Sequence, residues 1–129
     1  MISLKDFKVG QKAYRVRFFG YTSRKGEIQE VYVHVVGRKY VKISSSPYSP
    51  DSIASLYSFE VNEPEADGAN CLVQHEDYGT HDLLFCSLKD YEDWRELQDL
   101  RKWFYEAAHN ARKLSLEQLR QIKGIIEPF

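Results

Sequence analysis

Cations and aromatic side chains alternate along the first third of the chain in a pattern that suits contact with nucleic acid. Lys and Arg hold phosphates, and aromatic rings stack on bases. The residues that we expect to make these contacts are Lys12, Arg15, Arg17, Arg38, Lys39, Tyr40 and Lys42. Tyr32 and His34 fall at outward positions of the same predicted sheet. Alternatively, this set is the solvated face of a small barrel, or it docks against the chain's own acidic segment.

The sign of the charge changes along the chain. Residues 1–50 contain ten Lys and Arg against three Asp and Glu, and residues 51–99 contain two against thirteen. Residues 100–129 are basic again, with six Lys and Arg against three Asp and Glu. The net charge of −1 therefore conceals a strong separation of positive and negative charge along the chain. A basic front segment can face phosphate, whereas an acidic middle segment can face a basic site on a protein.

The acidic segment supports an alternative function of a different class. In this hypothesis the chain is a protein–protein module that inhibits a host or defence protein, because its carboxylates imitate phosphate in a basic site. The residues assigned to this alternative are Glu60, Glu63, Glu65, Asp67 and Trp103. Trp103 joins the acidic residues because it falls off the main apolar stripe of its predicted helix.

One short stretch, HEDYGTHD at residues 75–82, collects imidazole and carboxylate groups that suit a divalent metal. It lacks H-E-x-x-H, C-x-x-C and EF-hand spacing, so an acidic hairpin turn explains it better, and we predict no metal and no cofactor. Cys86 with His81 matches no known Cys/His nucleophile pattern, and both common glycine-rich phosphate motifs are absent. We therefore expect a non-enzymatic protein.

Alternation of period two predicts the elements that must carry the basic side chains. The predicted strands cover residues 14–18, 28–36, 39–43, 57–61, 71–73 and 83–85. In the first of them, Arg15 and Arg17 face outward, opposite the apolar residues. A turn at Gly37-Arg38 joins the second strand to the third. About five short, twisted strands joined in this way predict a small antiparallel β-barrel.

The second and third predicted strands keep the alternation along their whole length. Val31, Val33 and Val35 share the inward face of the second strand. Val41 and Ile43 point inward from the third strand. Both strands therefore add β-branched side chains, which favour strands, to one core.

After residue 87 the apolar period changes to that of a helix, which predicts two helices packed on the barrel. Ser87 with Asp90, and Ser115 with Gln118, have the spacing of helix-capping pairs. The apolar residues that we expect to complete the barrel core are Leu97, Phe104, Leu119 and Ile122. The prediction is an α+β fold in a single domain, 1–129, with a barrel part at 1–86, an acidic insertion at about 62–82, and two helices at 87–129.

Several observations bear on the compartment. The sequence has no run of about 18 apolar residues, and its start, MISLKDFKVG, lacks the basic-then-apolar pattern of a signal peptide. Cys71 and Cys86 lack C-x-x-C spacing, which favours reduced thiols over a disulfide framework. We expect a soluble, cytoplasmic protein with no membrane partner.

Five segments together resemble a known group of proteins. They are FKVGQKAYRV, EVYVHVVGRKYVKI, SLYSFEV, LFCSLKDYEDWRELQDL and LSLEQLRQIKGII, and VGRKYV and LSLEQLRQI are the most specific parts. The chain, from Phe7 to Ile126, is similar to small β-barrel-domain accessory proteins of bacteriophages, prophages and mobile elements of Gram-positive bacteria. That group has no assigned activity, so the resemblance implies only context, a phage or mobile-element accessory protein. The charge pattern of the chain leaves DNA, RNA or a host protein as its expected partner.

Overall fold

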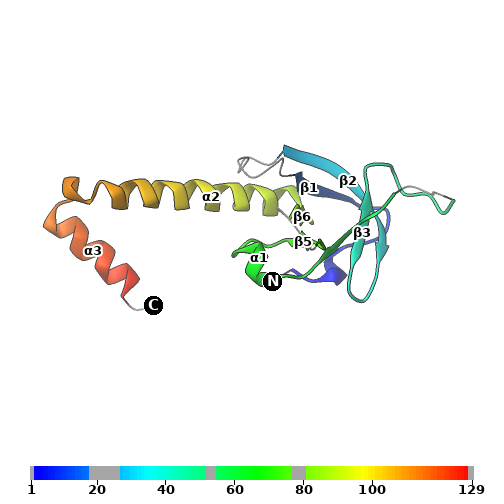
Figure 1. Cartoon of the computed structure of the whole chain (residues 1–129), viewed down its shortest axis with the longest axis horizontal. Helices are drawn as coiled ribbons and strands as arrows, with labels where there is room; N and C mark the ends of the chain where they lie inside the picture. Colours follow the sequence, from blue (N-terminus) through cyan, green and yellow to red (C-terminus); the bar gives the residue numbers. More distant parts are fainter. Residues whose placement is uncertain (1, 18–26, 52–54, 77–80, 128–129) are drawn as a thin grey trace. The chain divides into compact units, whose positions relative to one another are not determined.

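The structure is a computed structural model that describes residues 2–17, 27–51, 55–76 and 81–127. Contacts divide the chain into two compact units, Met1–Trp94 and Arg95–Phe129 (Figure 1). The first unit contains all the strands, and the second contains helices. The single domain and the packing of the helices on the barrel both stay predictions.

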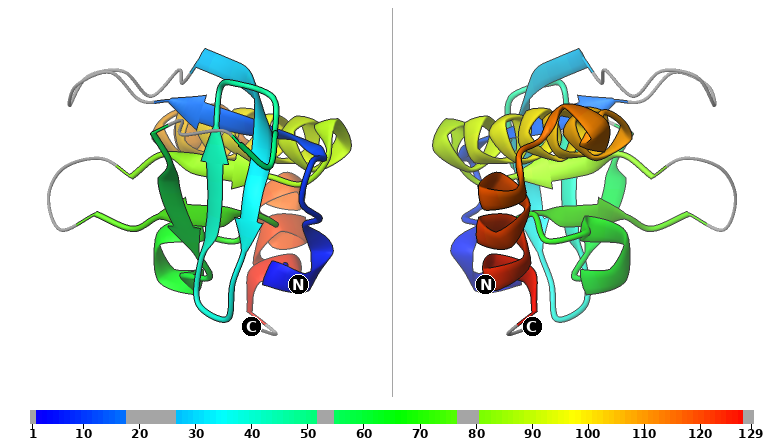
Figure 2. Two further views of the ribbon diagram at one scale, coloured as in Figure 1. Left: turned by 90° about the vertical axis from the view of Figure 1, so that its right-hand side faces the viewer. Right: turned by 90° about the vertical axis from the view of Figure 1, so that its left-hand side faces the viewer.

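Six antiparallel strands form a closed barrel in chain order (Figures 1 and 2). They are β1 (Lys12–Arg17), β2 (Glu27–Val36), β3 (Val41–Ser44), β4 (Tyr57–Glu60), β5 (Leu72–Gln74) and β6 (Leu83–Phe85). The barrel closes where β1 pairs with β6, with Tyr14 opposite Phe85 and Val16 opposite Leu83. The α+β prediction of a small antiparallel barrel followed by C-terminal helices is confirmed, with six strands rather than about five.

One apolar cluster fills the barrel interior, because every strand turns alternate residues toward it. Its buried members are Ile2, Phe7, Ala13, Val31, Val33, Val41, Ile43, Phe59, Leu72 and Leu84. The cross-strand pairs Val41 with Phe59 and Leu72 with Leu84 lie on this face. The inward positions predicted for Val41 and Ile43 are therefore confirmed.

A second cluster covers part of the outer surface of the barrel. Its buried members are Val16, Ala66, Cys71, Val73, Leu83, Phe85 and Trp94. Ala66 ends the short helix α1 (Glu63–Ala66), and Trp94 lies in α2 (Leu88–His109), with its ring 5.8 Å from that of Phe85. Strand β1 is consequently buried on both faces, with Ala13 inside the barrel and Val16 beneath this outer layer.

The alternation predicted for β2 fails at one position. A register shift lies between Val33 and Val35, so that Val35 pairs with Lys42 and Val36 pairs with Val41. Because a bulge inserts one residue into the strand, the inward face passes from Val33 to Val36. The inward position predicted for Val35 is wrong: its side chain is exposed.

The helices begin where the capping pairs predict. The Ser87 hydroxyl accepts a hydrogen bond from the Asp90 backbone N–H at the start of α2. Ser115 and Gln118 form a reciprocal capping box at the start of α3 (Leu116–Ile126). The 3-10 helices η1 (Leu4–Asp6) and η2 (Ala111–Lys113) precede β1 and α3, respectively. None of the helices in the described ranges is long and apolar enough to cross a lipid bilayer.

Neither buried cluster contains a residue from the second unit. The expectation that Leu97, Phe104, Leu119 and Ile122 complete the barrel core stays a prediction, like the packing of the helices on the barrel. Phe104 and Leu119 are exposed in the second unit. The last residue of either cluster in chain order is Trp94.

Burial of Cys71 makes the stability of the barrel sensitive to alkaline pH. The residue is 1 % exposed, and burial raises the pKa of its thiol from 9.0 to about 12. Because the folded-state pKa lies above the usual one, this contribution to stability is complete below pH 9 and is lost as the pH rises toward 12. We expect the free energy of unfolding to fall more steeply in the parent than in Cys71→Ala between about pH 8 and about pH 11.

Urea denaturation at the two pH values measures this difference, with Cys86→Ala as the matched control. Cys86 is only half-buried, and its sulfur lies 3.2 Å from the Asp6 carbonyl oxygen. If the free energy of unfolding changes equally with pH in the parent and in Cys71→Ala, the raised pKa of Cys71 does not contribute to stability and this prediction is wrong.

Candidate nucleic-acid interface

The structure separates the predicted basic set into different parts of the barrel. Lys12 is exposed on β1, and its amino group lies 4.0 Å from a Glu30 carboxylate oxygen on β2. Arg17 is exposed at the end of β1. The remaining predicted cations, apart from Arg15, belong to the β2–β3 hairpin and to β3. Two further cations of the front segment, Arg24 and Lys25, lie outside the described residues.

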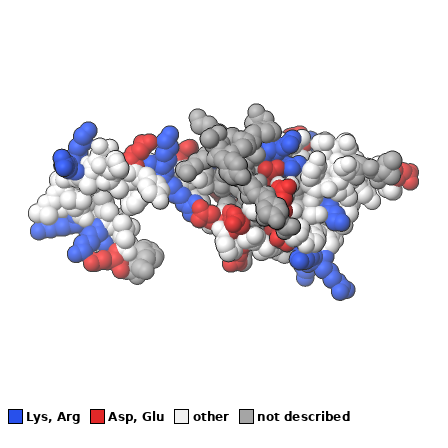
Figure 3. Space-filling model, in the orientation of Figure 1, with Lys and Arg blue, Asp and Glu red and all other residues white. Residues whose placement is uncertain are grey.

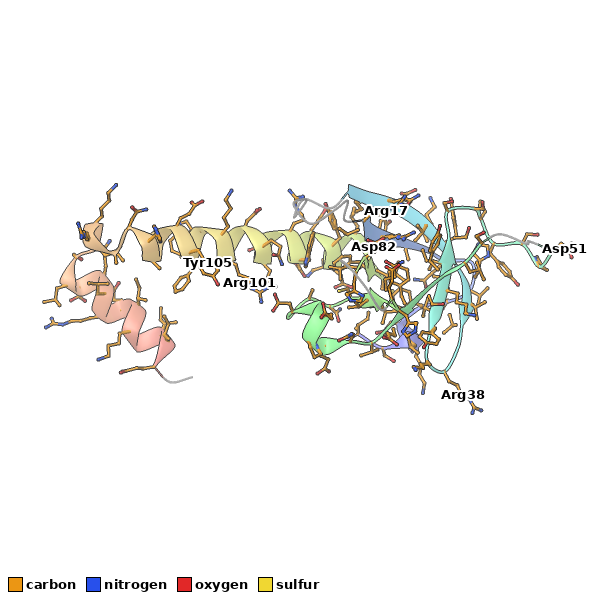
Figure 4. All side chains as sticks on the ribbon, viewed as in Figure 1. Arg17, Arg38, Asp51, Asp82, Arg101 and Tyr105 are labelled. Atoms are coloured by element: carbon orange, nitrogen blue, oxygen red, sulfur yellow. The ribbon has the colours of Figure 1, made fainter. Side chains whose placement is uncertain are left out.

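The β2–β3 hairpin presents its cations because Gly37 allows a close approach of the backbone. The Gly37 N–H donates a hydrogen bond to the Tyr40 carbonyl oxygen at 2.8 Å. A Cβ atom on Gly37 would lie 3.2 Å from the same oxygen, which is a tight contact. Arg38 and Lys39 are exposed between these two residues, and Figure 4 labels Arg38 at the tip of the hairpin.

Tyr40 is the centre of a small polar and aromatic cluster. Its ring centroid lies 5.0 Å from that of His75, and the Lys39 amino nitrogen lies 5.3 Å from the Tyr40 ring centroid. His75 Nδ1 in turn lies 3.3 Å from a Glu60 carboxylate oxygen. We call Lys39, Tyr40, Glu60 and His75 the Tyr40 cluster. It joins the hairpin to the ends of β4 and β5.

Tyr40 also affects the pKa of Lys39. A side-chain hydrogen bond and the charge interaction with Tyr40 raise the pKa of Lys39 above its usual value of 10.5. Lys39 is positively charged at neutral pH, as an exposed lysine ordinarily is. A cation held next to an aromatic ring is a favourable pairing for binding phosphate and base together.

Lys42 extends the Tyr40 cluster along the outside of the barrel. Its neighbours Val41 and Ile43 are buried, which places Lys42 on the outer face of β3, opposite Ser58 of β4. We call the surface made by Arg38, Lys42 and the Tyr40 cluster the β3–β5 face. It contains three Lys and Arg and one histidine against a single carboxylate. Figure 3 shows Lys and Arg side chains gathered at the end of the barrel where Figure 4 labels Arg38.

Arg15 does not lie on an outward basic face, and that prediction is wrong. The residue is only 6 % exposed, and its guanidinium nitrogens lie 2.7 and 2.9 Å from one carboxylate oxygen of Asp82. Its Cζ atom lies 4.4 Å from the ring centroid of Tyr57 and 5.8 Å from that of Phe59. Because Arg15 shares the inward face of β1 with Ala13, it pairs with a buried carboxylate and is not available to phosphate.

His34 is not open to solvent, contrary to what its predicted outward position implies. His34 lies at the β2 bulge and is buried, with Nε2 2.8 Å from the Ser46 carbonyl oxygen. Its ring packs edge-on against Tyr48 at 5.6 Å. The histidine therefore anchors the segment that follows β3. Tyr32 remains half-buried on β2.

The residues assigned to the acidic alternative occupy three places. Glu63 and Glu65 are exposed in α1, and Asp67 caps its end in the left-handed conformation with φ of 52°. Figure 3 shows acidic side chains gathered over this part of the first unit. Glu60 belongs instead to the Tyr40 cluster. Trp103 lies in the second unit and is 63 % exposed.

The histidines and carboxylates of residues 75–82 have separate partners. His75 contacts Glu60, and His81 Nδ1 lies 3.0 Å from the Gln74 carbonyl oxygen. Asp82 pairs with Arg15. Within the described residues no group of three or more His, Cys, Asp or Glu side chains is placed to hold a metal ion. Residues 77–80 of this stretch lie outside the described part of the chain.

Sequence reasoning missed two aromatic residues of interest, His75 and Tyr57. In the sequence, His75 falls in a predicted turn. However, the inward and outward alternation of Leu72, Val73 and Gln74, extended by one residue, puts His75 at an outward position. The pairing of Gln74 with Phe59 brings that position to the β3–β5 face. Tyr57 falls in the predicted strand 57–61, with no pattern that distinguishes it from its neighbours.

The fold and the β3–β5 face define a small closed-barrel domain with C-terminal helices and a basic, aromatic outer surface. The chain belongs to the phage ProQ C-terminal-like domain family, and the match runs over residues 1–128. It is thus a member of a phage-associated family, which agrees in part with the resemblance seen in the sequence. The chain matches no curated protein. It matches no solved structure either.

Proposed function

We propose that this chain is a non-enzymatic RNA-binding domain that contacts the phosphate backbone through the β3–β5 face. The observation that carries the proposal is the arrangement of Lys39 and His75 around the ring of Tyr40, with Lys42 and Arg38 on the same surface. Membership of the ProQ C-terminal-like family supports it, because ProQ C-terminal domains are linked to RNA binding. This link favours RNA over DNA.

The physical argument rests on how the face is built. Its strands pair across a closed barrel, so the side chains that they carry start from a rigid surface. Positive charge draws the phosphate backbone, and the Tyr40 ring offers a surface on which a base can stack. Contacts of this kind bind single strands with little dependence on sequence. Lys12 and Arg17 add positive charge elsewhere on the same barrel.

Reversing two charges on the face is expected to weaken RNA binding and to reduce its dependence on salt. For a single strand, the slope of log affinity against log salt is about −0.7 for each phosphate contact. Lys39→Glu with Lys42→Glu therefore reduces the slope by about 1.4 if each lysine meets one phosphate. Fluorescence-anisotropy titrations of a short single-stranded RNA at about 50 mM and about 200 mM salt measure both quantities.

The matched control is Arg112→Glu with Lys113→Glu, which makes the same change in net charge on exposed residues of the second unit. We expect the control to keep most of the parent's affinity and slope. Equal losses in the two double variants would show that overall charge, and not the β3–β5 face, governs binding. If the parent binds RNA more weakly than about 100 μM at low salt, the proposal is wrong. The alternative of a host-protein inhibitor would then be favoured, with substitution of Glu63 and Glu65 of α1 and of its C-cap residue Asp67 as the first test.

A further inference from the structure

Arg15 and Tyr57 lie together at the end of the barrel where β1 ends and β4 begins. Tyr57 lies opposite Ile43 and two residues before Phe59, and both of these are fully buried inside the barrel. Tyr57 therefore starts on the inward face of its strand, yet it is 46 % exposed. We call this place, made by Arg15, Tyr57 and Asp82, the barrel mouth.

One side of the Tyr57 ring is already occupied. The guanidinium carbon of Arg15 lies 4.4 Å from the ring centroid, which is stacking distance. Because one face of the ring lies against Arg15, the exposed area of Tyr57 belongs to the remainder of the ring and to the hydroxyl. Tyr57 thus brings a half-exposed aromatic side chain to the end of the barrel.

This aromatic surface is held rigidly. Arg15 cannot leave the Tyr57 ring freely, because two of its nitrogens bond the same oxygen of Asp82 at 2.7 and 2.9 Å. Both partners of this ion pair are buried. A ring that rests on an immobile support loses little conformational freedom when a ligand stacks on it, which favours binding.

We propose that Tyr57 at the barrel mouth is a stacking site for an unpaired RNA base, a proposal that rests on the proposed RNA-binding function. A base fits better than an aliphatic group because the site offers a flat π surface with a cation behind it. Arg17 follows Arg15 by two residues on the same face of β1 and is exposed, which places a further cation near the barrel mouth.

The barrel mouth and the β3–β5 face lie within reach of one strand of RNA. Tyr57 and Glu60 are the first and last residues of β4, so they are about 10 Å apart along the strand. That distance corresponds to about three nucleotides at the 3.4 Å rise of stacked bases. The two sites can therefore contact one strand together, with phosphates and one base on the β3–β5 face and a second base on Tyr57.

The test compares a single-stranded RNA of about eight nucleotides with an abasic oligonucleotide of the same length. We expect the parent to bind the base-bearing RNA more tightly. Tyr57→Ala is expected to weaken binding of the base-bearing RNA by about fivefold to a hundredfold and to leave the abasic oligonucleotide unaffected. Tyr57→Phe, which keeps the ring, is the matched control and is expected to bind both as the parent does. Tyr57→Leu, which keeps apolar packing without a π surface, is expected to behave as Tyr57→Ala does.

The outcomes separate the two proposals. If the parent binds neither oligonucleotide, the proposed RNA-binding function fails and the barrel-mouth site fails with it. If the parent binds RNA but Tyr57→Ala binds it equally well, only the barrel-mouth site is overturned. A loss that is equal for base-bearing and abasic oligonucleotides also overturns it, because that pattern shows a structural role for Tyr57.

Discussion

Replacing Arg15 by methionine is expected to lower the free energy of unfolding by about 3–5 kcal/mol. The substitution keeps an unbranched apolar stem, although a shorter one, and removes the guanidinium partner of the buried Asp82 carboxylate. A buried ion whose partner has been removed retains its full desolvation cost. Removing one half of a buried ion pair is therefore strongly destabilising. Guanidinium chloride denaturation followed by circular dichroism measures the change.

The double variant Arg15→Met with Asp82→Leu is the matched control. Because it replaces both charges with apolar groups of similar size, we expect most of the lost stability to return. The comparison separates the cost of an unpaired charge from the cost of altered packing. A loss below about 1 kcal/mol in Arg15→Met, the level typical of an exposed ion pair, would contradict the buried pair.

Trp94→Ala is expected to lower the free energy of unfolding by about 3–5 kcal/mol, as removal of a large core aromatic does. Trp94 is 7 % exposed, and its ring lies within 5.8 Å of Phe85 and 6.1 Å of Tyr91. The chain offers a matched control in its other tryptophan. Trp103→Ala is expected to change stability by about 0.5 kcal/mol or less, because Trp103 is exposed.

Chemical denaturation of the two variants, monitored by the fluorescence of the tryptophan that remains, distinguishes these positions. Similar losses in both would mean that Trp103 is as buried as Trp94. Trp103 would then be a core residue, which removes it as a surface candidate for partner binding.

Local patterns in the sequence were enough to predict the β2–β3 hairpin and the helix starts. Gly37 marks the turn, and the Ser115 and Gln118 pair depends only on residues three apart. Such features are determined by neighbours in the chain, so they survive in almost any tertiary context. The strands predicted at residues 71–73 and 83–85 are also confirmed, as β5 and β6, and they pair with each other.

The face of β1 could not be predicted, because alternation separates two faces without saying which one lies inside. Val16 and Ala13 are both fully buried, on opposite sides of the strand. The usual rule that charged residues face solvent therefore put Arg15 on the wrong side. Only the partner carboxylate, Asp82, distant in sequence, makes the inward position tolerable.

The candidate site was predicted only in part, for a similar reason. Lys39, Tyr40 and Lys42 are neighbours in the chain, and their shared surface follows from one strand and its turn. His75 and Glu60 join them through strand pairing between distant segments, which no local period reveals. The bulge near His34 is likewise a product of pairing, since the sequence of β2 alternates without a break.

The pairing of the first strand with the last has a consequence for how fast the chain folds. The barrel closes only when Tyr14 pairs with Phe85, so two segments that are far apart in the sequence must come into contact first. Contacts between such distant residues place a protein among the slower two-state folders, in the range of milliseconds to seconds. The Arg15–Asp82 pair spans the same seam, so a chain that has not yet closed leaves both charges in water. Stopped-flow refolding of Asp82→Leu with Arg15→Met would show whether forming this pair contributes to the kinetic barrier.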